Sequence, residues 1–183
     1  MNPIERLCKR RELGKHLEER RGRLHRIANS WCRSRSLADD LVQEAFAKAL
    51  RHFGQLREPQ AFDAWLFHIL HHCWIDHCRR ERPCEDIDSF SNTTELSAEQ
   101  PQERMDIVHR VRAAIADLPV GQREVLTLVD LAGFSYAEVA MILEIPTGTV
   151  TSRISRAREA LRDQLMLLTE RPGNVVPIRI ARA

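Results

Sequence analysis

The chain has 183 residues, of which 43% are hydrophobic and 30% are charged, and its formal net charge is +2. It is therefore long enough for one large or two small domains and has enough apolar residues to bury a core. No apolar run approaches a membrane span, and the polar, basic start has no signal-peptide core, so we expect a cytoplasmic protein without direct membrane insertion.

The chain begins with a strongly basic segment. Residues 1–35 hold eleven Lys or Arg against four Glu, a charge balance suited to contact with a polyanion. Apolar residues at helical spacing predict a long helix over residues 4–34. A second amphipathic helix is predicted over residues 37–53, with Ser36 as its N-cap and Asp39 three residues further on.

A third helix is predicted after a loop that contains Gly54 and Pro59. This helix starts at Phe62 and carries an apolar stripe. The segment that follows has no sustained period, and residues 81–106 hold eight Asp or Glu against two Arg. We interpret it as an acidic linker. The sequence therefore predicts an all-α fold of two small helical domains joined by a flexible linker.

The C-terminal third has the signals of a helix-turn-helix. Gly133 suits the left-handed position that ends a helix. Ser135 and Glu138 have the spacing of a capping box, in which each side chain bonds the other residue's backbone. Pro146 disfavours helical geometry in the residue before it, which ends the second helix, and Thr147 can begin and cap the third.

The last helix has two different faces. Its buried stripe is predicted to be Val150, Ile154, Ala157 and Leu161. The opposite face carries hydroxyl and guanidinium groups, which are the groups that base edges and phosphates require. An ordinary solvated face is the alternative, but the two-helix lead-in and the short turn favour DNA recognition.

Two sets of motifs resemble bacterial extracytoplasmic-function sigma factors. Residues 39–46 (DDLVQEAF), 64–69 (AWLFHI) and 75–77 (IDH), with Arg79-Arg80, look like region 2 of that family. Residues 118–125 (LPVGQREV), 136–140 (YAEVA) and 148–158 (GTVTSRISRAR) look like its region 4. The two sets occur in the family's order with a spacer between them, which is more specific than either set alone.

The resemblance implies a domain plan and a set of partners. Residues 1–82 would form region 2, 83–104 the acidic linker, 105–168 the region 4 helix-turn-helix and 169–183 a tail. The partners would be core RNA polymerase, through its β′ and β subunits, promoter DNA, and an anti-sigma factor. The function would be promoter-specific initiation of transcription, with no cofactor.

The resemblance also assigns roles to particular residues. The helix over residues 37–53 would dock on a coiled coil of the polymerase β′ subunit through Asp40, Gln43 and Glu44. The −10 element would be recognised and melted by His71, His72, Trp74, Arg79 and Arg80. The −35 element would be recognised by Thr149, Thr151, Ser152, Arg153, Ser155 and Arg156.

This sequence departs from the family at some of these positions. Many members carry Arg-Asn where this chain has His71-His72, so the preferred −10 base does not transfer from relatives. Thr151 stands at a position that is often basic in relatives, so we expect this chain to lack one phosphate or base contact there. Trp65 is in phase with the apolar stripe and is predicted to be core, whereas Trp74 is off the stripe and is the better candidate for stacking on a base.

A cluster of histidines and cysteines leaves one alternative open. His68 with His72, and Cys73 with His77, are four residues apart on one helix and could share a metal ion. A metal- or redox-responsive regulator using residues 68–84 is therefore one alternative, and a free-standing helix-turn-helix regulator is another. The five cysteines, Cys8, Cys32, Cys73, Cys78 and Cys84, are expected to be reduced thiols. The sequence has no Gly-rich phosphate loop, HExxH pair or nucleophile–base motif, so we expect no enzyme and no resident metal.

Overall fold

A computed structural model of the chain describes residues 3–55, 59–81 and 103–169, and these residues form helices, turns and short connections without a strand. The elements in chain order are α1 Pro3–Cys32, α2 Arg35–His52, η1 Phe53–Gln55, η2 Pro59–Ala61, α3 Phe62–Glu81, α4 Glu103–Ala116, α5 Val120–Leu126, η4 Thr127–Leu131, α6 Tyr136–Leu143 and α7 Thr147–Thr169. None of these helices is both long and apolar enough to cross a membrane. The predicted all-α class is confirmed.

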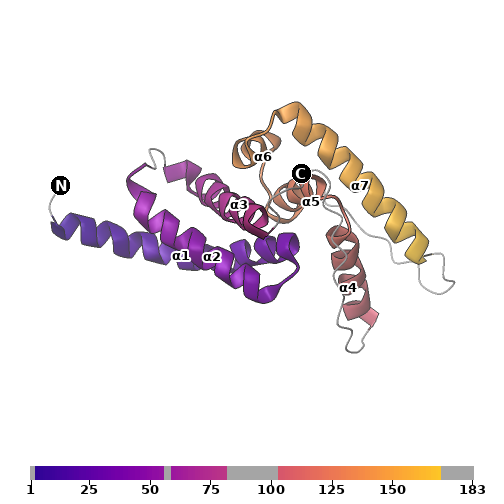
Figure 1. The fold of residues 1–183 in the computed structure, drawn as a ribbon, viewed down its shortest axis with the longest axis horizontal. Coiled ribbons are helices and arrows are strands. Elements are labelled where there is room, and N and C mark those ends of the chain that lie inside the picture. Colours follow the sequence, from indigo (N-terminus) through magenta and orange to yellow (C-terminus); the bar gives the residue numbers. More distant parts are fainter. Residues whose placement is uncertain (1–2, 56–58, 82–102, 170–183) are drawn as a thin grey trace.

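The N-terminal half consists of α1, α2 and α3, which pack side by side (Figure 1). Leu24 and Trp31 from α1, Leu41 from α2, and Leu66 and Leu70 from α3 are almost completely buried in its core. Burying one such aliphatic side chain contributes about 2 kcal/mol of hydrophobic free energy. The predicted helix over residues 4–34 is confirmed as α1.

The predicted N-cap of the second helix is wrong by two residues. The side chain of Ser34, not Ser36, accepts a hydrogen bond from the backbone N–H of Leu37, and α2 already begins at Arg35. Arg33 has a left-handed backbone (φ 57°), which turns the chain sharply between α1 and α2. This tight turn places the cap earlier than the apolar pattern indicated.

The C-terminal half consists of α4 to α7 and contains the predicted helix-turn-helix. Ser135 and Glu138 form the capping box at the start of α6, and Gly133 has a positive φ of 77°. Helix α6 ends before Glu144, which has a left-handed backbone (φ 54°), and α7 begins at Thr147 as predicted. One turn of π-helix, η4, precedes this motif.

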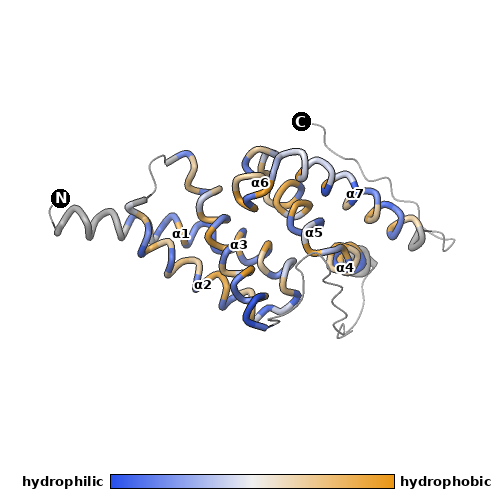
Figure 2. Tube along the Cα trace, turned by 45° about the horizontal axis from the view of Figure 1, so that its top comes forward, coloured by the Kyte–Doolittle hydropathy of each residue, from blue (hydrophilic) through white to orange (hydrophobic). Residues whose placement is uncertain are grey.

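The two halves contact each other directly. Helices α1 and α3 pack against α5, η4 and α6, and one hydrophobic cluster runs through both halves. Figure 2 shows strongly hydrophobic stretches on α5 and α6 toward the middle of the molecule, whereas α7 carries hydrophilic stretches along its length. We call the contact between the two halves the interface. Most of the predicted linker, residues 83–102, and of the predicted tail, residues 170–183, lies outside the described residues.

Candidate nucleic-acid interface

Helix α7 presents a polar face above a buried stripe. Val150, Ile154 and Ala157 are buried, as predicted, and hold α7 against α5 and α6. The opposite face carries the side chains predicted to contact the −35 element. Four of the six are exposed, namely Thr151, Ser152, Ser155 and Arg156, and two are half-buried, namely Thr149 and Arg153.

Two hydroxyls on this face bond back to their own helix. Thr151 Oγ1 donates to the carbonyl of Thr147 at 3.1 Å, and Ser152 Oγ donates to the carbonyl of Thr149 at 3.0 Å. Such bonds fix the direction of the hydroxyl and leave its oxygen free to accept from a base amine. These residues therefore offer acceptors of defined orientation.

The arginines of α7 are held to different degrees. The guanidinium of Arg153 lies directly over Gly121 of α5, where an added Cβ would be 2.7 Å from its Nη1. Arg158 donates to both carboxylate oxygens of Asp130, at 2.7 and 3.2 Å, and this bond raises the pKa of Arg158. Arg156 is exposed between them. One guanidinium is thus positioned by packing, one anchors the helix to η4, and one faces solvent.

The residues predicted to contact the −10 element divide into two groups. His72, Arg79 and Arg80 are exposed on α3. Trp74 is 5% exposed and His71 9%, and both lie at the interface against Glu124 of α5. In this arrangement the second group faces protein instead of solvent.

The two tryptophans pack differently from what the apolar stripe of α3 alone indicates, although Trp65 does pack against the core as predicted. Trp65 is only partly buried, whereas Trp74 is buried and donates from Nε1 to Glu124 Oε1 at 3.0 Å. The apolar stripe predicted for α3 describes one side of the helix correctly. Trp74 is buried although it lies off that stripe, because a second surface, supplied by α5 50 residues further on, covers it.

The interface between the two halves also contains buried charged side chains. Arg123 is 2% exposed, and its guanidinium donates to the carbonyls of Trp31 at 2.8 Å and Leu118 at 3.1 Å. Burial lowers the pKa of Arg123. Glu124, 5% exposed, accepts the bond from Trp74. Because desolvation offsets much of the attraction between buried charges, such groups add little net stability to the contact between the two halves.

Arg23 of α1 also crosses the interface. Its guanidinium lies 5.3 Å from the ring centre of Phe67 and 4.9 Å from that of Phe134. It donates to Asp63 Oδ2 at 2.7 Å and to the carbonyl of Ala132. Phe67 and Phe134 meet edge to face at 5.0 Å. One side chain therefore joins the two halves through hydrogen bonds and two aromatic rings.

The residues predicted to bind core polymerase lie on α2. Asp40 and Gln43 are exposed, and Glu44 is half-buried. The Glu44 carboxylate pairs with Lys48 at 3.0 Å and lies 3.9 Å from Arg80. Of these three residues, the carboxylate of Asp40 and the amide of Gln43 are therefore the groups most available to a partner.

Among the described cysteines of the His/Cys cluster, Cys73 is buried and Cys78 is half-buried. Burial raises the pKa of Cys73 to about 11 and that of Cys78 to about 12. Such thiols stay protonated near neutral pH, which is the form that neither ligates a metal nor reacts with an oxidant. The predicted pairing of Cys73 with His77 in a metal site therefore has no support among the described residues.

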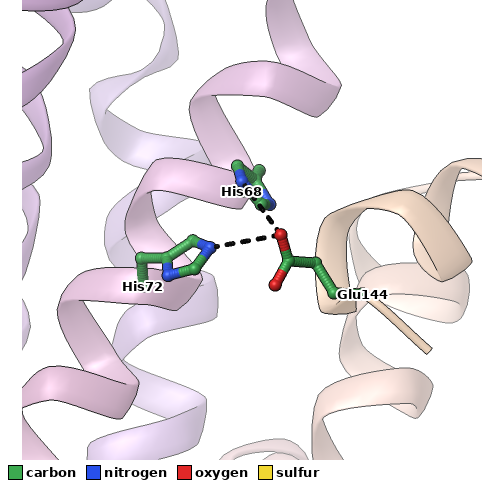
Figure 3. A group of neighbouring side chains, drawn as sticks. All are labelled: His68, His72 and Glu144. Atoms are coloured by element: carbon green, nitrogen blue, oxygen red, sulfur yellow. Dashed lines mark ion pairs between the residues drawn. The ribbon is translucent and has the colours of Figure 1, made fainter.

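The histidine pair has a third neighbour that sequence reasoning missed. His68 and His72 of α3 face Glu144 at the end of α6, and Figure 3 shows both rings directed at one carboxylate. The Nε2 atoms of His68 and His72 lie 3.8 and 3.7 Å from Glu144 Oε1. Burial and the adjacent His68 lower the pKa of His72. No local signal could have found Glu144, because the interface alone brings it to α3.

Comparison with known families locates two matches in this chain. Residues 17–83 match the Sigma-70 region 2 family, and residues 109–161 match the Sigma-70, region 4 family. The first match covers most of α1 to α3, and the second covers the helix-turn-helix. Both matches agree with the order of motifs found in the sequence.

Several proteins of known identity are similar to this chain. It is 38% identical over 143 residues to the RNA polymerase sigma-H factor of Pseudomonas aeruginosa, covering 72% of this chain and 74% of that protein. It is 40% identical over 126 residues to the ECF RNA polymerase sigma factor EcfG of Rhodopseudomonas palustris, covering 68% of each. It is 35% identical over 144 residues to the ECF RNA polymerase sigma-E factor of Escherichia coli, covering 72% of this chain and 75% of that protein.

Two solved structures share the fold. The sigma factor RpoE in complex with the anti-sigma factor NepR, from Bartonella quintana, has a TM-score of 0.72 and 29% identity, and the match covers 85% of this chain and 98% of that one. CnrH in complex with the cytosolic domain of CnrY has a TM-score of 0.63 and 27% identity, covering 86% and 89%.

Proposed function

Because the chain belongs to the extracytoplasmic-function family of RNA polymerase sigma factors, we propose that it binds core RNA polymerase and directs it to specific promoters. The observation that carries the proposal is the presence, in one chain, of a region 2 match and a helix-turn-helix whose last helix exposes hydroxyls and a guanidinium. A protein of this kind supplies recognition and melting to a polymerase and has no catalysis of its own. It would act in the cytoplasm.

We assign residues 1–82 to polymerase docking and the −10 element, 105–168 to the −35 element, and 83–104 to a connector. Helix α7 would enter the major groove with Thr149, Thr151, Ser152, Arg153, Ser155 and Arg156. Arginine is the usual bidentate partner of guanine, and hydroxyls suit either bases or phosphates. Support comes from the exposure of the central part of this face.

In region 2, His71, His72 and Trp74 would hold an unstacked base, and Arg79 and Arg80 would contact phosphates. Imidazole and indole rings supply stacking surfaces, and ring nitrogens supply hydrogen bonds to a base edge. Asp40, Gln43 and Glu44 would meet the β′ subunit. The exposed acid and amide on α2 support this docking role for the first two residues.

Promoter binding would require the two halves to separate. The His72 and Glu144 side chains are 3.7 Å apart, and Thr149 is only five residues, at most about 18 Å of chain, beyond Glu144. By the positions that name them, the −35 and −10 elements are centred about 25 base pairs apart, roughly 85 Å of duplex at about 3.4 Å per base pair. The closed arrangement therefore cannot span both elements, and it also covers His71 and Trp74.

We further propose that an anti-sigma factor regulates this chain. Support comes from the two structural relatives, one described as a complex with an anti-sigma factor and the other as a complex with a cytosolic domain of a second protein. A partner that stabilises the contact between the halves would keep the −10 residues covered. Release of the partner would then permit opening.

Run-off transcription with purified core polymerase tests the function directly. A promoter library in the presence of this chain is expected to give specific transcripts. Arg156→Ala should reduce them by about 5- to 150-fold if the guanidinium contacts a base, whereas Arg162→Ala, exposed further along α7, should change them little. If the chain binds duplex DNA but never core polymerase, it is a free-standing regulator, and the proposal is wrong.

A further inference from the structure

Three side chains to which the proposed function gives no shared role, His68, His72 and Glu144, lie close together at the interface between the two halves. The two histidines come from successive turns of α3, and the carboxylate comes from the residue that ends α6. Their ligand atoms all lie within 4.8 Å of one another. In the part of the chain that the structure describes, this is the His, Cys, Asp and Glu group with metal-site geometry.

The distances are close to those of a metal site. In a tetrahedral zinc site with ligand bonds of about 2.1 Å, neighbouring ligand atoms are about 3.4 Å apart. Here the Nε2 atoms of His68 and His72 are 3.8 and 3.7 Å from Glu144 Oε1. The His72 and Glu144 side chains are 47% and 65% exposed, so an ion can reach them from solvent. Two imidazoles and one carboxylate leave a fourth position for water.

A neighbouring hydrogen bond prepares His68 for this role. His68 Nδ1 lies 3.2 Å from the carbonyl oxygen of Ile142, and because a carbonyl only accepts, the proton must be on Nδ1 when this bond forms. The lone pair is then on Nε2, the nitrogen that faces Glu144. A backbone carbonyl is one of the usual partners of the outer nitrogen of a histidine that ligates a metal in proteins.

The backbone conformation of Glu144 also supports a binding role for this residue. Its φ of 54° is a left-handed conformation, which at the end of a helix is usually given to glycine or asparagine. A larger side chain at such a position costs about 1 kcal/mol, and such strain concentrates at binding sites. The carboxylate is thereby placed opposite the two imidazoles (Figure 3).

We propose that His68, His72 and Glu144 bind a divalent transition-metal ion such as zinc, and that the bound ion holds α6 against α3. The ion would favour the closed arrangement, because opening withdraws Glu144 from the two histidines. An ion that bound only the closed form, at 100 times its dissociation constant, would shift the equilibrium toward that form by about 100-fold. The regulatory consequence, inhibition of promoter binding by zinc, rests on the proposed function.

Metal binding is tested first without any activity assay. The full-length, metal-stripped chain is titrated with zinc by calorimetry, and with cobalt(II), whose visible absorption reports tetrahedral coordination. We expect one ion per chain. Glu144→Gln and His68→Gln should weaken zinc binding by about 10-fold or more.

Two further variants protect this test against trivial explanations. Glu144→Gly removes the carboxylate while relieving the left-handed backbone, so lost binding in this variant cannot be attributed to unfolding. His77→Gln is the matched control, because His77 pairs with Glu81 at 3.7 Å on the same helix without belonging to the three-residue group. Unchanged zinc affinity in the Glu144 variants, or equal loss in His77→Gln, would overturn the proposal.

The regulatory part is tested by transcription with core polymerase with and without zinc. Zinc should inhibit the wild-type chain, and Glu144→Gln should be active and insensitive to zinc. Hydrogen exchange of α3 should slow with zinc in the wild type only. If no transcript appears even in metal-free buffer, the proposed function fails while the binding data still decide the site. If transcription is normal but zinc has no effect on it, the regulatory inference fails.

Discussion

At the scale of single residues, Gly121 and Arg153 form a close contact that depends on the absence of a side chain. A Cβ at position 121 would lie 2.7 Å from Nη1 and 2.9 Å from Cζ of Arg153. Because the clash involves the end of a flexible side chain, Gly121→Ala should displace the guanidinium without unfolding α5. Alanine is also the better helix former by about 1 kcal/mol.

We therefore expect Gly121→Ala to keep or raise the melting temperature while weakening binding to a −35 duplex. Fluorescence anisotropy and thermal unfolding measure the two effects separately. Gly148→Ala is the control, since nothing lies within 4 Å of an added Cβ there. Equal duplex affinity in both variants would mean that the position of Arg153 over Gly121 has no part in recognition.

The thiols of Cys73 and Cys78 give a second prediction at this scale. With a pKa of about 11, Cys73 is almost entirely protonated at pH 7. Its thiolate fraction there is about 300-fold below that of a free cysteine with a pKa of about 8.5. Alkylation of Cys73 and Cys78 in the folded chain, followed by mass spectrometry, should be slow by at least that order. Rapid labelling of the native protein would restore a redox role for this cluster.

At the scale of elements, the capping box explains why a helix as short as α6 is well defined. Ser135 Oγ accepts from the N–H of Glu138 at 3.3 Å, and Glu138 accepts from the N–H of Ser135 at 2.8 Å. Ser135→Ala should lower the free energy of unfolding by about 1 kcal/mol, measured by urea denaturation. Ser155→Ala, at an exposed position inside α7, should be neutral or slightly stabilising. A Ser135 variant as stable as the wild type would contradict this account.

The helices themselves were largely predictable from the sequence, because each depends on signals within a few residues. Apolar spacing predicted α1 and the buried stripe of α7, and local capping chemistry predicted the start of α6. The position of Trp74 was not predictable in this way. Its environment is supplied by Glu124, 50 residues away. The position of Glu144 was unpredictable for the same reason, since it meets His68 only where the two halves touch. Local patterns carry no information about such pairings.

At the scale of the whole molecule, Arg23 is the side chain whose removal should most directly loosen the closed arrangement. It bonds Asp63 within the N-terminal half and the carbonyl of Ala132 across the interface, and it stacks on Phe134. Arg23→Ala should therefore expose α3. We expect faster hydrogen exchange in α3 and α5 and tighter binding of the free protein to a two-element promoter.

The control for this prediction is Arg26→Ala, an exposed arginine one turn further along α1. It removes the same charge without touching the interface, so any general electrostatic loss of DNA affinity appears in both variants. If Arg23→Ala and Arg26→Ala bind the promoter equally, the contact between the halves does not limit DNA binding.

The side chains of the interface also limit which amino-acid substitutions this sequence can accept. Trp74 must fit Glu124 when the molecule is closed, and by our assignment it must fit a nucleotide base when the molecule is open. One residue is then selected for two different neighbours. A substitution that improves either fit is expected to worsen the other. Such positions should therefore accept substitutions more slowly than other residues that are equally buried. A substitution on one side of the interface should be accompanied by a compensating substitution in the other half of the chain.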